Sequence, residues 1–135
     1  MKKIKDVLNE LNGELCLQTI AMPKDANYQG DIFGGWVVSQ MDLAGAVLAH
    51  RVAQGRVATV AMNDVLFKLP VAVGDVCRCH VIMLKEGRTS ITVEVQVWTS
   101  KQHAMQNQAL AASALITYVA IDDQGQPLEF AKDVV

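Results

Sequence analysis

The chain has 135 residues, enough for one domain with its own core but too few for two, so we expect a single domain over residues 1–135. Apolar residues make up 51% of it and charged residues only 19%, which excludes an intrinsically disordered protein. The formal net charge of −2 gives no global attraction to nucleic acid, so a phosphate-bearing ligand would need a local group of basic side chains.

The first half of the chain predicts one strand and one long helix. An amphipathic helix is expected over residues 3–11 and a strand over residues 14–21, followed by a polar loop with Pro and Gly over residues 22–31. Over residues 34–53, apolar residues occupy most directions around a helical axis. Such a pattern predicts a helix that is largely buried.

The second half predicts strands only, at residues 57–69, 75–85, 89–99 and 109–122. The third of these alternates cleanly and places four apolar residues on one face, namely Ile91, Val93, Val95 and Val97. Short turns join the strands, which makes neighbouring strands antiparallel, and one apolar helix needs a curved sheet to cover it. The sequence therefore predicts an α+β domain in which an antiparallel, curved sheet of about five strands wraps around a long central helix.

The cysteines favour a reducing compartment. Cys77 and Cys79 are two positions apart in an expected strand and share a face, which makes a bridge between them difficult. With Cys16 the count is odd, as is typical of reduced thiols in a cytoplasmic protein. No ligand spacing accompanies them, so we expect no metal site. Neither a signal-peptide core nor an apolar run of membrane-spanning length occurs, so we expect no membrane association.

The stretch NYQGDIFGGWVVSQMD, residues 27–42, joins a glycine-bearing loop to the start of the expected helix. The first amides of a helix have no intrahelical partner and lie at the positive end of its dipole. Gly34 and Gly35 have no side chain, so their N–H groups can face a substrate oxygen and stabilise charge that develops on a carbonyl.

Asp42 lies about two helical turns beyond these glycines, roughly 10 Å along the axis. Most residues three or four positions from it are small or polar, which leaves room beside the carboxylate. A carboxylate in such a partly apolar slot can have a raised pKa and act as a general base, or it can attack as a nucleophile. The alternative is a solvated helix face that Asp42 shares with Ser39 and Ala49, with a glycine pair that only forms a tight turn.

Four segments of the chain carry a family resemblance: MPKDANYQGDIFGGWVVSQMDLAGAVLAHRVAQGRVATV, FKLPVAVGDV, KEGRTSITVEVQVW and YVAIDDQG. Over roughly residues 15–125 the sequence resembles the hot-dog-fold acyl-CoA thioesterases, in particular their bacterial YciA-like branch. The resemblance implies a hot-dog fold and hydrolysis of acyl-CoA to a free carboxylic acid and CoA, without a serine nucleophile, in fatty acid metabolism.

The same resemblance implies an assembly and a set of ligands. It implies homodimers that assemble further into a hexamer, a trimer of dimers, with active sites at the subunit interface. It implies no metal and no organic cofactor, because the CoA thioester is the substrate and CoA is a product that can stay bound.

Roles transfer from the family to individual positions of this sequence. Asp42 takes the place of the catalytic carboxylate, the Gly35 amide that of the donor to the thioester carbonyl, and Asn27 that of the loop asparagine that positions water or the carbonyl. Contacts with the substrate and its CoA moiety are implied for Arg56, Thr59, Phe67, Lys68, Arg88, Thr89 and Ser90. Whether Asp42 is a nucleophile or a general base stays open.

The sequence departs from the family pattern at one basic residue. Relatives commonly carry Lys directly before Pro, whereas here Leu69 stands between Lys68 and Pro70. A shift of one residue in a strand sends a side chain to the opposite face. Either a bulge compensates for the shift or the charge is lost from that position.

Two other functions fit the same fold. A hot-dog hydratase or dehydratase normally works with a histidine near the helix, but His50 lies at the far end of the expected helix. A non-catalytic acyl-CoA-sensing module would keep the pocket and lose the carboxylate, whereas Asp42 is present. The sequence does not predict the preferred acyl chain length, because that depends on packing around the pocket.

Overall fold

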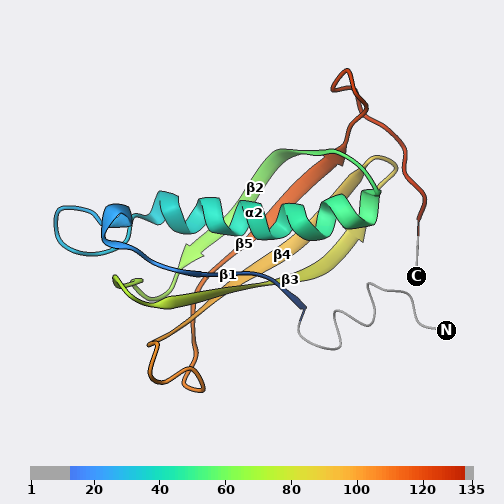
Figure 1. Cartoon of the computed structure of the whole chain (residues 1–135). Coiled ribbons are helices and arrows are strands. Elements are labelled where there is room, and N and C mark those ends of the chain that lie inside the picture. The colour runs from blue at the N-terminus through green and yellow to red at the C-terminus, as the bar shows by residue number, and fades with distance from the viewer. Residues whose placement is uncertain (1–12, 133–135) are drawn as a thin grey trace.

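The computed structural model describes residues 13–132, and the helix expected over residues 3–11 lies outside them. The described elements follow the predicted order, with small differences at their ends (Figure 1). They are β1 (Glu14–Ile20), the short 3-10 helix η1 (Pro23–Asp25), the long helix α2 (Gly34–Ala53), β2 (Val57–Phe67), β3 (Val76–Glu86), β4 (Ser90–Ser100) and β5 (Ala109–Ala120). The five predicted strands and the long helix are confirmed, and η1 was not predicted.

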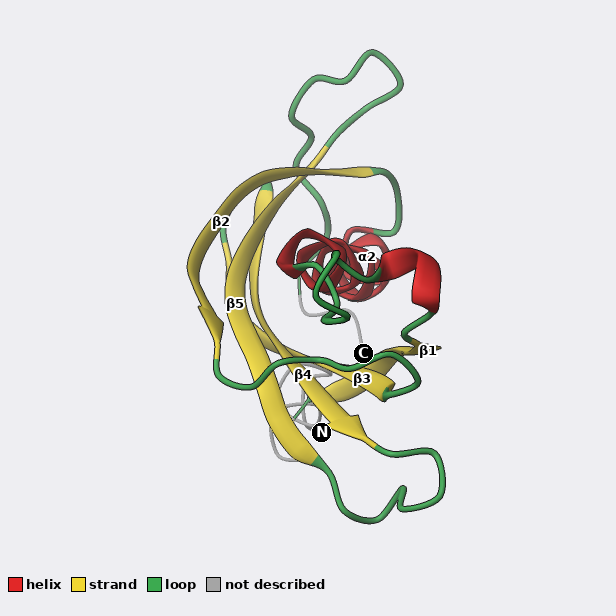
Figure 2. Cartoon of the chain, turned by 90° about the vertical axis from the view of Figure 1, so that its left-hand side faces the viewer, coloured by secondary structure: helices red, strands yellow, loops and turns green. Residues whose placement is uncertain are grey.

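The strands form a single antiparallel sheet in the order β1-β3-β4-β5-β2. Seen along the helix, the sheet curls around one side of α2 (Figure 2). Strands β1 and β2 are the two edges, although β2 directly follows the helix in the sequence. This is the α+β, hot-dog arrangement that the sequence predicts.

The core lies between α2 and the concave face of the sheet. The four alternating residues of β4, from Ile91 to Val97, are at most 1% exposed, as predicted. Met41 and Leu48 of α2 are fully buried against them, and so is Tyr118 of β5. Aliphatic side chains dominate this core because only 5% of the chain is aromatic.

The cysteines are free thiols, as predicted, and two of them belong to the core. Burial raises the pKa of Cys77 to about 11 and that of Cys79 to about 12, so both stay protonated near neutral pH. Within residues 13–132 no group of three or more His, Cys, Asp or Glu side chains is placed to hold a metal ion. No helix in that part of the chain is long and apolar enough to cross a membrane.

The prediction that α2 is largely buried holds only for the side of the helix that the sheet covers. Leu43 and Val47 are 57% and 47% exposed, because the sheet covers only one side of the helix. The apolar composition of the helix indicated which residues favour burial, but it did not indicate which other element packs against each of them. The exposed side of α2 is therefore an apolar surface of the isolated chain.

The edge strand β2 is irregular along its length. Its pairing with β5 shifts register between Thr59 and Ala61 and again between Asn63 and Leu66, and Asp64 between the latter two has a left-handed φ of 52°. Such bulges bend a strand and increase its local twist.

A further irregularity follows directly after β2. The backbone amides of Lys68 and Leu69 both donate to the carbonyl of Ala111, at 2.7 and 3.1 Å. Two residues therefore face one, which is the pattern of a bulge. For Lys68, which is shifted by one residue from the family position, the sequence left open whether a bulge accompanies the shift, and the structure shows that it does.

Candidate active site

Asp42 projects from α2 toward the edge strand β2. The hydroxyl of Thr59 donates a hydrogen bond of 2.7 Å to Oδ1 of its carboxylate. No lysine or arginine of residues 13–132 forms an ion pair with this carboxylate. The solvated-face alternative does not hold, because Asp42 is half-buried and Ala49 is completely buried. Among the described residues, the Asp42 carboxylate therefore accepts a hydrogen bond from the Thr59 hydroxyl and is not neutralised by a basic side chain.

A buried tyrosine supports Asp42 from the sheet side. The hydroxyl of Tyr118, on β5, donates a hydrogen bond of 2.7 Å to the backbone carbonyl oxygen of Asp42. Burial and the negative charge of Asp42 raise the pKa of Tyr118, so its hydroxyl stays a donor. Gly45 makes room for this contact, because a Cβ at that position would collide with the tyrosine hydroxyl. Sequence reasoning missed Tyr118, and the signal for it was a glycine inside a helix.

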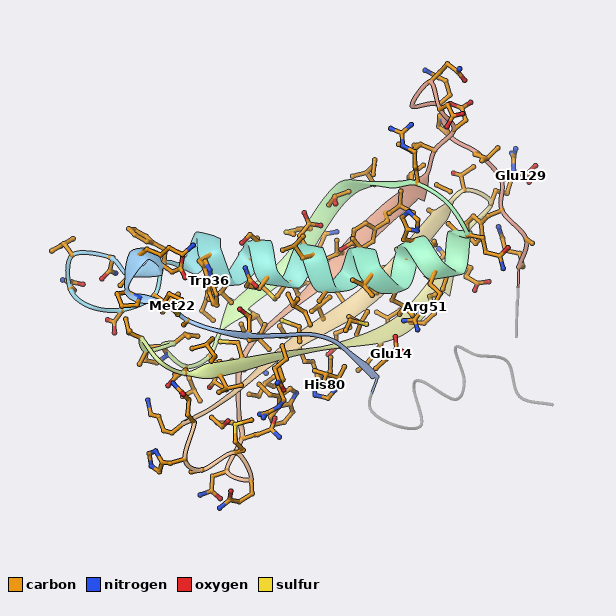
Figure 3. All side chains as sticks on the ribbon, in the orientation of Figure 1. Glu14, Met22, Trp36, Arg51, His80 and Glu129 are labelled. Atoms are coloured by element: carbon orange, nitrogen blue, oxygen red, sulfur yellow. The ribbon has the colours of Figure 1, made fainter. Side chains whose placement is uncertain are left out.

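The N-terminus of α2 is open. The amides of Trp36 and Val37 donate to the carbonyl of Phe33, at 3.1 and 3.3 Å, whereas those of Gly34 and Gly35 have no backbone acceptor within residues 13–132. A Cβ added to Gly35 would meet nothing within 4 Å, so the backbone there is accessible from outside. Figure 3 shows Trp36 at this end of α2 and Arg51 near the other end. The Gly35 amide can therefore donate to an oxygen that approaches the helix end.

A pocket of about 230 Å³ lies between this helix end and the end of β2. The ring of Phe67 packs against Gly34, where an added Cβ would stand 3.2 Å from the ring. Ile32 and Val37 give the pocket further apolar walls, and Lys68 is the one basic residue among those that line it. The pocket suits an apolar group that lies close to the helix N-terminus.

Asn27 shapes the loop before the helix. Its side-chain oxygen accepts hydrogen bonds from the amides of Gln29 and Asp31, at 2.9 and 3.1 Å. These bonds form an Asx-type turn and fix the path of the loop. Because the oxygen is used in this way, only the NH₂ group of Asn27 is left to contact a reactant, and its role in positioning stays a prediction.

Four of the predicted substrate contacts gather at the end of the sheet where β2 begins. Val57 pairs with Ala120, whose amide donates to the carbonyl of Thr89, at 2.8 Å. Ser90 follows Thr89 and pairs with β5 as well. Arg56 donates to the carbonyl of Asp122, at 3.2 Å, and the side chain of Arg88 is 84% exposed beside Glu129. Arg56, Arg88, Thr89 and Ser90 therefore form one cluster.

Within one chain, the predicted site residues do not form one constellation. Phe67 and Lys68 lie at the opposite end of β2 from the cluster around Arg56. Asp42 is seven residues beyond Gly35 on the helix, which corresponds to about 10 Å along its axis. Two groups that act on the same carbonyl must each lie within about 3 Å of it. A single chain therefore does not bring Asp42 and the Gly35 amide to the same reacting carbon.

Known proteins are similar to this chain in sequence and in fold. The model of the thioesterase superfamily matches residues 29–106. The acyl-CoA thioester hydrolase YciA of Salmonella typhimurium is 48% identical over 121 residues, which cover 88% of this chain and 91% of that protein.

Two solved structures are similar over most of the chain. The hexameric thioesterase y2039 from Yersinia pestis has 47% identity and a TM-score of 0.86 over 90% of this chain and 98% of that one. An aspartate-to-alanine mutant of a hexameric broad-specificity acyl-coenzyme A thioesterase has 43% identity and a TM-score of 0.85, over 90% and 88% of the two chains.

Proposed function

The chain belongs to the thioesterase superfamily, and on this premise we propose that it hydrolyses acyl-CoA to a free carboxylic acid and CoA. The substrate class is taken from the names of relatives that are similar over most of their length. The observation that carries the proposal is the Asp42 carboxylate, which Thr59 holds at 2.7 Å with no basic side chain of the described residues paired to it. Such a carboxylate is free to take a proton or to form a bond.

Asp42 serves the reaction by one of two routes. As a general base it accepts a proton from water while the water oxygen adds to the thioester carbon, and the C–S bond then breaks as that proton passes to the departing sulfur, which releases the thiol of CoA. As a nucleophile its oxygen bonds to that carbon, the thiolate leaves, and water hydrolyses the resulting anhydride. In both routes the carbonyl oxygen gains negative charge, which a helix N-terminal amide such as that of Gly35 stabilises.

The active site is completed by a second subunit. Asp42 and Gly35 of one chain are about 10 Å apart along the helix, so we assign them to two different sites. In each site, Asp42 of one subunit faces Gly35 and Asn27 of its partner. The exposed Leu43 and Val47 and the edge strand β2 provide the apolar surface and the unpaired backbone for such a homodimer. Since two similar thioesterases are hexameric, we extend the proposal to a trimer of dimers.

Two separate groups of residues in each chain bind different parts of the substrate. The pocket at Phe67 and Lys68 receives the acyl group near the carbonyl. The cluster of Arg56, Arg88, Thr89 and Ser90 supplies basic and hydroxyl groups for the phosphates of CoA. No metal or organic cofactor is required by this chemistry, and we place the protein in the cytoplasm because its three cysteines are free.

The hydratase alternative lacks a histidine in the right place. His50 is exposed in the last turn of α2, far from the helix N-terminus. His80 and His103 lie on β3 and in the loop after β4, not on the helix. Thioester hydrolysis through Asp42 is therefore the function that the geometry supports best.

The test is thiol release from acyl-CoAs of increasing chain length, with the wild type and Asp42→Asn in parallel. We expect the variant to lose about 10³-fold in kcat with little change in KM, because the amide still binds but takes no proton. Asp123→Asn changes an exposed aspartate in a turn and is the matched control, with unchanged rates. Full activity of Asp42→Asn would refute this role, and a wild type that binds but never hydrolyses acyl-CoA would make the protein a sensing module.

A further inference from the structure

A buried arginine lies on the face of the sheet away from α2. Along β3, Cys77 and Cys79 point into the core, so Arg78 and His80 lie on the other face. Figure 3 shows His80 on the side of β3 that faces away from the helix. Arg78 is only 9% exposed, although it is charged and lies on the outer face. Fully buried arginines are rare in proteins unless they are paired with an acidic group.

Among the described residues, the hydrogen-bond partners of the Arg78 guanidinium are all neutral. Nε donates to Oε1 of Gln18 at 2.8 Å, Nη1 to Oγ of Ser100 at 3.3 Å, and Nη2 to the thioether sulfur of Met105 at 3.1 Å. No carboxylate of residues 13–132 forms an ion pair with it. A thioether is a weak acceptor, so Nη2 has the poorest partner of the three. The positive charge is thus buried without a negative group from the described part of the chain, which is costly.

The positive charge of Arg78 affects the pKa of the neighbouring His80. Burial and the positive charge of Arg78 together lower the pKa of His80, the next residue on the same face of β3. The imidazole is therefore neutral near pH 7 and does not add to the charge. Arg78 is left as the buried cation of this part of the sheet.

A pocket of about 550 Å³ opens beside two of the residues that bind Arg78, although Arg78 itself does not line it. It is lined by Gln18, Thr19, Ile20, Val76, Gln102 and Met105. Two of these residues, Gln18 and Met105, are hydrogen-bond partners of the guanidinium. The volume lies in the range of pockets that hold small organic ligands, and the walls offer both amide and apolar groups.

We propose that this pocket binds a small organic anion whose carboxylate or phosphate group is held by Arg78. An oxyanion would replace the sulfur of Met105 on Nη2 with a charge-assisted hydrogen bond, which is about twice as strong as a neutral one. Met105 belongs to the loop between β4 and β5, so its side chain can leave without disturbing the sheet. Ile20 and Val76 then contact the apolar part of the ligand. The site lies on the opposite face of the sheet from Asp42, and it does not depend on the proposed hydrolysis.

The chain provides its own reporter for this site. It has two tryptophans, and Trp98 of β4 is the cross-strand partner of Arg78. In a Trp36→Phe background, fluorescence comes from Trp98 alone and is insensitive to ligands near the helix N-terminus. We would titrate this protein with octanoate and, separately, with inorganic phosphate. We expect a saturable change in Trp98 emission with at least one of them, and the two arms show whether the site takes a carboxylate, a phosphate or both.

Two variants test the role of the guanidinium. Arg78→Gln removes the charge and is expected to weaken binding of the anion at least about tenfold. Gln18→Glu is the second variant, because it keeps the size of a side chain that is 2.8 Å from Nε and provides an internal carboxylate. It should abolish anion binding with the fold intact, as circular dichroism would show. Lys85→Gln removes an exposed cation from the same strand and is the matched control, with unchanged affinity.

Three results would overturn the proposal. The first is a Trp98 signal that neither octanoate nor phosphate changes. The second is binding that is unaffected in Arg78→Gln or in Gln18→Glu. The third is a change in the size of the assembly on gel filtration of Arg78→Gln without any anion effect, because the guanidinium would then pair with a carboxylate of another subunit.

Discussion

Strands β4 and β2 have the same length but differ in almost every other respect. Strand β4 lies in the middle of the sheet, and each of its four alternating apolar residues is at most 1% exposed. Strand β2 is an edge with two register shifts, a left-handed Asp64 and exposed apolar residues such as Val60 and Leu66. The regular strand supports the core, whereas the irregular one carries Thr59 and Phe67 to the candidate site. The regular strand and the strand that carries candidate site residues are therefore two different strands of the sheet.

The first prediction tests whether stability resides in β4. Val95→Ala removes two methyl groups from a fully buried position and should lower the free energy of unfolding by about 2–3 kcal/mol, measured by urea denaturation. The matched change in β2 is Val60→Ala, at a residue that is 56% exposed, and it should cost less than about 0.5 kcal/mol. An equal cost at the two positions would show that Val60 is buried in the assembly and would remove the contrast.

The second prediction tests whether activity resides in β2. Thr59→Val deletes the hydroxyl that donates to Asp42 at 2.7 Å and should lower kcat about tenfold, because the carboxylate loses the group that positions it. The effect on stability should be small, because Thr59 is exposed. Thr92→Val is the control in β4, because the Thr92 hydroxyl contacts only that of Thr117, at 3.2 Å, on the outer face. We expect its kcat to be unchanged. If Thr92→Val lost activity and Thr59→Val did not, activity would depend on β4 and not on β2.

The third and smallest effect concerns the opposite edge strand, β1. Arg51 of α2 binds Glu14 of β1 through an ion pair, and this hydrogen bond holds the pKa of Glu14 below its ordinary value despite partial burial, which opposes it. A lowered pKa in the folded state gives stability that is present above the ordinary pKa and is lost as the pH falls through the folded one.

We therefore expect Glu14→Gln to lower the melting temperature near pH 7 only slightly, because the pair is only partly buried and should contribute less than about 1 kcal/mol to stability. The difference between variant and wild type should vanish as the pH is lowered below about 4.5, the ordinary pKa of the carboxyl. Melting curves between pH 3 and pH 7 check this. A difference that grows on acidification would show that the pair does not stabilise the fold.

The order of the elements could be read from the sequence because it depends on local pattern. Alternation with a period of two marks β4, and an apolar run that starts after Gly34 and ends near Gly55 marks α2. Asp42 stood out as a carboxylate in the expected helix behind a glycine pair, but its catalytic role came from the family resemblance and stays a prediction. The exact setting of Asp42 could not be read from the sequence, since Thr59 and Tyr118 are 17 and 76 residues away from it.

The tertiary structure decided which surfaces meet. It left Leu43 and Val47 exposed, which composition alone had counted as buried, because a five-stranded sheet covers only one side of a helix. It also placed the cluster at Arg56 and the pocket at Phe67 at opposite ends of β2. The sequence by itself determined the order of the elements and the place of Asp42 on the helix, because both are local properties of the chain. The neighbours of Asp42 and the burial of Arg78 depend on strand order and register, which local periodicity does not specify.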